Sequence, residues 1–143
     1  MASPYDAVLR IRKREVDAAA EAFRFAAEGL ETLEARLGHS QDAYANESNL
    51  PVDDLTMRSD LYLLQMLDMM ADLRQSIGHA AAELEERRTE LLQVLAESKA
   101  LEQLVETHEE ALRLAAERTE QAQNDDRVAF VFRARELERG VAA

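Results

Sequence analysis

The sequence of 143 residues contains no cysteine and no tryptophan, and only four glycines and two prolines. Without cysteine the chain can form neither a disulfide framework nor a thiolate metal site. Short strands joined by turns need Gly, Pro and β-branched residues, so this composition nearly excludes a β-sandwich or barrel. Ala, Leu, Glu and Arg are abundant instead, which is typical of long helices and coiled coils. The length fits a single domain.

Positive charge is also scarce. The 17 basic residues face 29 acidic ones, for a net charge of −12, which argues against binding to nucleic acid. The basic residues are concentrated at the ends, because residues 1–14 sum to +3 and residues 127–143 to +2. A hairpin would bring two such ends together; incidental clustering on a solvated surface explains the pattern equally well.

Long apolar runs are missing too. The most apolar stretch, residues 61–67, is closed by Asp60 and Asp68 and is far too short to span a bilayer. The first residues contain no apolar signal-like region. We therefore expect a cytoplasmic protein that does not insert into the membrane.

No constellation of residues predicts catalysis. The four glycines are scattered and form no phosphate-binding loop. His39, His79 and His108 lie far apart, and His79 with Glu83 is at most half of a metal site. The sequence predicts a protein that is not an enzyme and that needs no cofactor and no metal.

A seven-residue repeat organises the first third of the chain. Its two series are Leu9, Val16, Phe23, Leu30, Leu37, Tyr44 and Arg12, Ala19, Ala26, Leu33, Ser40. Alternating steps of three and four residues place both series on one stripe of a helix and favour a coiled coil. We expect this helix at about residues 4–46, with Ser3 as its cap and Pro4 in its first position.

The repeat breaks and then resumes. The bend is expected at about 47–53, where Pro51 opposes a helix and Asp53 or Asp54 can cap the next one. The second pair of series is Leu63, Met70, Ile77, Leu84, Leu91, Ser98, Val105, Leu112 and Met66, Leu73, Ala80, Arg87, Val94, Leu101, His108, Ala115. Polar members such as Arg87, Ser98 and His108 commonly fix the register of a coiled coil.

These repeats predict an all-α fold, a long antiparallel two-helix coiled-coil hairpin whose second helix is longer than the first. We expect the second helix at about 54–123, followed by a frayed or redirected tail at 124–143, within one domain. Residues 94–115 would then have an apolar stripe without a partner inside the chain. Either a kink, for which Gly78 is a candidate, folds this part back, or another protein covers it, which we favour.

The segment DAVLRIRKREVDAAAEAF, residues 6–23, resembles the start of the flagellar export protein family FliJ. That family opens with an apolar and basic helix containing (K/R)-E-x-(D/E)-x-A, which residues 14–19 match. Further similarities follow in order: SNL before the bend, the L-x-x-x-I of residues 73–77, ESKALEQL at 97–104 and RTEQAQNDD at 118–126. The acidic net charge departs from the family, which is often basic.

The resemblance implies a stalk similar to that of rotary ATPases. FliJ proteins bind the hexameric export ATPase FliI, promote its assembly and activity, contact the cytoplasmic domain of the export gate FlhA, and handle export chaperones. The implied location is the cytoplasmic side of the inner membrane at the flagellar base, as a peripheral component. By position, the expected gate-binding residues are Leu37, Tyr44, Met69, Leu73 and Ile77, and the expected ring-binding residues are Arg10, Arg14, Arg118 and Gln121.

Two alternatives remain open. The chain could be the equivalent stalk of a virulence secretion system, since periodicity does not separate the two systems. It could also be a structural homodimeric scaffold in which the long second helix pairs with its copy. For Leu37 and Leu73, a plain core role is favoured over a role in binding.

Overall fold

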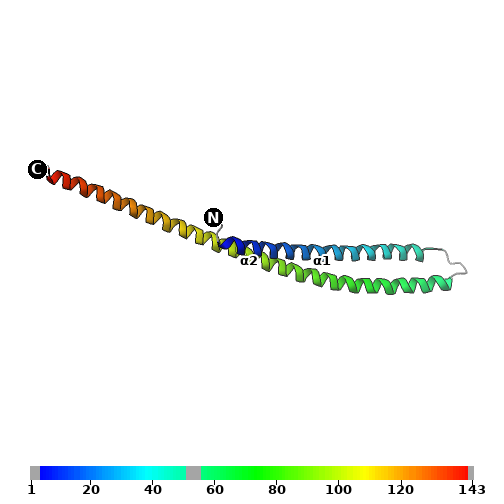
Figure 1. Ribbon diagram of the computed structural model, residues 1–143. Coiled ribbons are helices and arrows are strands. Elements are labelled where there is room, and N and C mark those ends of the chain that lie inside the picture. Colours follow the sequence, from blue (N-terminus) through cyan, green and yellow to red (C-terminus); the bar gives the residue numbers. More distant parts are fainter. Residues whose placement is uncertain (1–3, 51–55, 142–143) are drawn as a thin grey trace. The chain divides into compact units, whose positions relative to one another are not determined.

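The computed structural model describes residues 4–50 and 56–141. They form two α-helices, α1 (Tyr5–Ser48) and α2 (Thr56–Val141) (Figure 1). No strand occurs within these two ranges. The chain divides into two units, residues 1–98 and residues 99–143, and α2 continues from the first unit into the second. The predicted all-α fold with a longer second helix is confirmed.

The first unit is a helical hairpin. α1 and the first half of α2 run antiparallel, side by side (Figure 1). On α1, every position of the two predicted heptad series is half-buried. On α2, every residue from Asp60 to Ser98 that is not exposed belongs to the predicted series, and Met66 and Met70 are buried, with 5% and 3% of their surface exposed. The two stripes therefore face each other, and we call these heptad positions the seam.

The ion pair between Arg12 and Glu97 joins the two helices and shows their register. The guanidinium of Arg12 lies 3.2 Å from a carboxylate oxygen of Glu97. Because both helices rise equally per residue, this pairing brings Leu37 level with Leu73 to within about one residue, closer to the end of α1 at Ser48 than to its start at Tyr5. The heptad stripe explains why the two helices pack, and the ion pair shows how they align.

The end of α1 is stabilised by local hydrogen bonds. The hydroxyl of Ser48 and the backbone N–H of Asn49 both donate to the carbonyl of Ala45, at 3.0 and 3.2 Å. These bonds satisfy a carbonyl that has no partner further along the helix. The proposed caps Ser3, Asp53 and Asp54, and the proposed breaker Pro51, lie outside the described residues.

The course of α2 corrects the expected helix end and the expected tail. α2 does not end near residue 123 but continues to Val141, so residues 124–141 are helix and not a frayed or redirected tail. Ala, Arg, Glu and Leu favour helix, and neither Gly nor Pro interrupts the chain between Gly78 and Gly140. α2 also passes through Gly78 without a break.

The heptad seam ends well before α2 does. Val105 is buried, with 7% of its surface exposed, whereas every residue from Glu106 to Gly140 is exposed. Predicted seam members such as Leu112 and Ala115 are therefore uncovered. Neither helix contains, in its described residues, a stretch long and apolar enough to cross a bilayer.

Candidate binding surfaces

Four of the five residues expected to bind the export gate lie in the seam. Leu37, Tyr44, Leu73 and Ile77 are half-buried, at positions where the two helices of the hairpin face each other. Each therefore helps to hold the hairpin together, whatever else its side chain contacts. The register places Leu37 level with Leu73, so the structure brings these two together in the hairpin.

The fifth residue, Met69, points away from the seam and is 54% exposed. It belongs to a group of apolar side chains on the first turns of α2, which we call the hairpin-end cluster: Leu61, Tyr62, Leu64, Leu67 and Met69. Each of them is at least 40% exposed. At 100° per residue these side chains lie on several sides of α2, so the helix is apolar around most of its exposed surface. Exposed apolar surface of this extent marks interaction sites in soluble proteins, and methionine adapts readily to a partner surface. The hairpin-end cluster is thus the strongest candidate binding surface of the first unit.

The residues expected to bind the ATPase ring form two pairs. Arg10 and Arg14 are exposed and lie one turn apart on α1, in the first unit. Arg118 and Gln121 are exposed and lie about one turn apart on α2, in the second unit. None of the four takes part in an ion pair that the structure defines, whereas Arg12, between the first two, bonds to Glu15 at 3.1 Å and to Glu97.

Arginines in the seam direct their charge outward. Arg12 and Arg87 occupy seam positions, yet their side chains are 37% and 39% exposed. Arg87 lies 3.1 Å from Glu90 and 3.8 Å from Glu83 on its own helix. A long aliphatic stem can cover the seam while the guanidinium reaches acidic partners at its edge. The predicted register role of Arg87 is untested, because its ion pairs lie within α2.

The second unit contains a compact ion-pair group. Arg113 bonds to Glu110 at 2.5 Å and to Glu117 at 2.6 Å, one turn before and one turn after it. The hydrogen bond that Arg113 donates to Glu110, with a smaller contribution from the one it donates to Glu117, raises the pKa of Arg113 above its usual value. Arg113 therefore stays charged at any physiological pH, and these pairs support a helix that lacks tertiary contacts.

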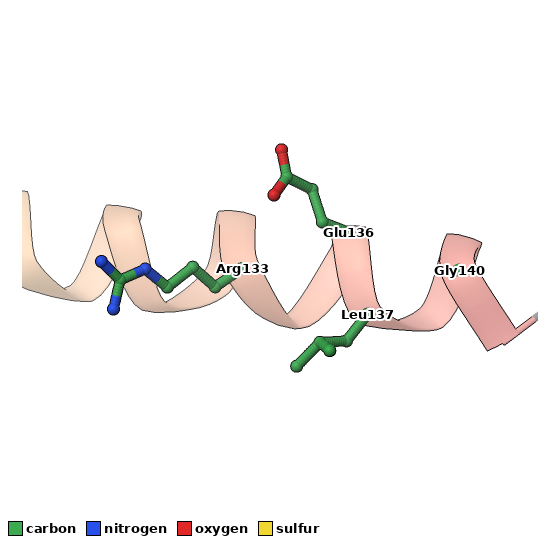
Figure 2. A pocket seen from close by; sticks show the side chains of 4 residues that line it. All are labelled: Arg133, Glu136, Leu137 and Gly140. Carbon is green, nitrogen blue, oxygen red and sulfur yellow. The ribbon is translucent and has the colours of Figure 1, made fainter.

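A hollow near the end of α2 is shallow and open to solvent. It is lined by Arg133, Glu136, Leu137 and Gly140, all on α2. Figure 2 shows Glu136 pointing away from Leu137, so these side chains do not converge on one point. No group of acidic or histidine side chains within residues 4–50 and 56–141 could hold a metal ion.

Two sets of exposed aromatic residues lie outside the binding sites predicted from the sequence. Phe25 lies on α1 outside the seam and is 78% exposed. Near the end of α2, Phe130 and Phe132 are 75% and 63% exposed. The sequence does contain a signal for Phe25, because it is a large apolar residue outside the heptad series. Phe130 and Phe132 lie in the segment expected to be a frayed or redirected tail, so the sequence predicted no exposed helical face there.

These features define a helical coiled-coil protein with exposed apolar and basic surfaces. The protein-family model described as Flagellar FliJ protein matches residues 1–137. The chain therefore belongs to the FliJ family, whose members are structural and coupling components of the flagellar export apparatus. Comparison with curated proteins and with solved structures found no match.

Proposed function

We propose that this chain is the non-enzymatic stalk of the flagellar protein export apparatus. In this role it binds the hexameric export ATPase FliI, promotes assembly and activity of the ring, and also binds the cytoplasmic domain of the export gate FlhA. It handles export chaperones and associates peripherally with the inner membrane at the flagellar base. The observation that supports this proposal most is the match of the FliJ family model to residues 1–137.

The gate is proposed to bind the hairpin end of the first unit. The hairpin-end cluster offers apolar side chains that the hairpin itself leaves uncovered, and Met69 lies within it. Burial of this apolar surface in a complex is favourable, by about 25 cal/mol per Å². Leu37, Tyr44, Leu73 and Ile77 contribute chiefly by holding the two helices in register beneath that surface.

The ATPase ring is proposed to bind the basic pairs. Arg10 and Arg14 have exposed guanidinium groups, and a rigid helix presents both on neighbouring turns. Arg118 and Gln121 likewise present exposed hydrogen-bond donors about one turn apart on α2. Asymmetric contacts between a stalk and the ring subunits bias the conformations of those subunits, which is how a protein without an active site can change a hydrolysis rate.

The test is the ATP hydrolysis rate and the oligomeric state of the cognate flagellar export ATPase, with and without this chain. We expect a higher rate together with a larger fraction of hexamer. The double variant Arg10→Glu/Arg14→Glu should lose this effect. Arg24→Glu is the matched control, because Arg24 is exposed on the same helix and lies 3.8 Å from Glu21. No change in rate with saturating wild-type chain would contradict the proposal.

The virulence-system alternative is tested by the same assay. Membership of the flagellar family favours the flagellar ATPase as the partner. We therefore expect stimulation of the flagellar enzyme to exceed stimulation of an injectisome ATPase measured in parallel. The reverse order would favour the virulence system.

A further inference from the structure

The second unit exposes apolar side chains that α2 alone cannot cover. Every residue from Glu106 to Gly140 is exposed, and Phe130 and Leu137 are 75% and 71% exposed. A helix that displays such side chains is normally buried against a partner. The distribution of these residues around the helix identifies the partner that fits.

Part of the exposed apolar surface is aligned. Because 18 residues make five turns of an α-helix, Leu112 and Phe130 lie on the same side of α2. The residues on that side form what we call the C-terminal ridge: Leu112, Ala116, Thr119, Gln123 and Phe130. Successive members are three, four or seven residues apart, which keeps them within one narrow stripe. The ridge has apolar ends and a polar middle.

The ridge is complementary to itself when two copies run antiparallel. With the twofold axis at residue 121, Leu112 of one copy lies opposite Phe130 of the other, and Thr119 lies opposite Gln123. The apolar ends then pack on each other, and the two polar middle residues meet. An interface of this kind uses the same patch on both copies, as twofold symmetry requires.

Charge favours the same arrangement. Residues 106–115 have a net charge of −2 and residues 127–136 a net charge of +2. The antiparallel alignment places each acidic segment against the basic segment of the other copy. A parallel alignment places acidic against acidic and basic against basic, which is repulsive. The charge pattern therefore favours the antiparallel direction over the parallel one.

We propose that the C-terminal ridge is a self-association surface through which two copies of this chain form an antiparallel dimer. Arg118 and Gln121, the proposed ring-binding residues of α2, lie on the other side of the helix. The dimer thus leaves them uncovered, and the inference does not depend on the proposed binding of the ATPase.

The first experiment is sedimentation equilibrium of the full chain over a range of concentrations. We expect the mass to rise from 16.1 kDa toward twice that value. Phe130→Glu should weaken the association at least about tenfold, since it places a carboxylate against Leu112. Phe132→Glu is the matched control: its side chain is also exposed, but it lies about 200° around the helix from Phe130. Circular dichroism verifies that both variants remain helical.

The second experiment determines the direction of the dimer. Because the natural chain has no cysteine, single-cysteine variants give unambiguous cross-links. A mixture of Ala116→Cys and Asp126→Cys chains should cross-link to each other, because these positions lie opposite in the antiparallel dimer. Each variant alone should cross-link poorly.

Three outcomes would overturn the proposal. One is a mass of 16.1 kDa at every soluble concentration, which would leave the ridge to a different protein. Another is equal weakening by Phe132→Glu and Phe130→Glu, which would indicate nonspecific association. The third is efficient cross-linking of Ala116→Cys chains with each other, which would indicate a parallel pair.

Discussion

At the scale of single residues, Met69 and Met70 show how sharply packing and binding are divided on α2. They are neighbours in the chain, yet 54% of Met69 is exposed and only 3% of Met70. Adjacent helical residues point about 100° apart, which is enough to place Met70 in the seam and Met69 in the hairpin-end cluster. Substitutions at these two positions therefore separate stability from recognition.

Met70→Asp is predicted to unfold the hairpin. It removes a buried apolar side chain and leaves a carboxylate without a partner, a loss of about 3 kcal/mol or more. Met69→Asp should keep the helical content and the melting temperature but weaken binding to the gate. Thermal melts by circular dichroism and a binding titration measure the two effects. Leu92→Asp is the control for binding, because Leu92 is similarly exposed (56%) on the same helix. A melting temperature lowered equally by both methionine variants would place Met69 in the core.

The ion pair between Arg12 and Glu97 is predicted to contribute little to stability. Both side chains are more than a third exposed, at 37% and 47%, so solvent screens their attraction. A double-mutant cycle with Arg12→Ala and Glu97→Ala should give a coupling of about 0.2–1 kcal/mol. Urea denaturation at low and high salt measures it, and the coupling should decrease with salt. A coupling energy that does not change with salt would indicate that the two side chains interact by something other than the attraction of their charges.

At the scale of helices, heptad periodicity predicted the seam but not the end of α2. The series from Leu9 to Tyr44 and from Leu63 to Ser98 match the half-buried and buried positions of the hairpin. Burial along the series ends at Val105, although the series reaches Ala115 and the helix itself continues to Val141. The heptad pattern indicates where a helix packs against another helix. A helix can continue beyond that point wherever helix-forming residues follow without Gly or Pro. The candidate site was harder to predict, because Leu37 and Met69 are both apolar and their exposure depends on register.

The glycines within the helices make a prediction about stability. A Cβ added at Gly29 or Gly78 meets no atom within 4 Å, so Ala fits without a clash. Each change should stabilise the chain by about 0.5–1 kcal/mol, because Ala restricts the unfolded backbone more than Gly does. Urea denaturation measures the gain. Gly140→Ala, near the end of α2, is the control and should have a smaller effect. A loss of stability in Gly78→Ala would show that α2 needs flexibility there.

At the scale of the whole molecule, the described chain has very few buried side chains. Among residues whose exposure is defined, only Met66, Met70 and Val105 are buried. Stability is therefore a sum of local helical terms and seam contacts, as in repeat proteins. Regions of such a molecule unfold locally and independently. The free energy of each local unfolding increases with the number of contacts that the region makes.

Hydrogen exchange should reveal this gradient. Backbone amides around Met66 and Met70 are predicted to exchange slowest, because the most deeply buried seam residues lie there. Amides from Glu106 to Gly140 should exchange fastest within α2 in dilute protein, since every residue there is exposed. Mass spectrometry of exchanged peptides measures the rates. Uniform protection of the amides along α2, in a sample shown to be monomeric, would contradict this predicted gradient.

The fully exposed stretch of α2 has a consequence for how tightly any partner holds it. A single helix in water, supported by pairs such as Arg113 with Glu110 and Glu117, interconverts with coil within about a microsecond. A partner that recognises only the helical form can bind only the fraction of molecules that are helical. Its apparent dissociation constant is therefore raised by the inverse of that fraction. Substitutions of side chains that contact no partner can therefore change the affinity. Along this stretch, helix propensity is itself a determinant of affinity.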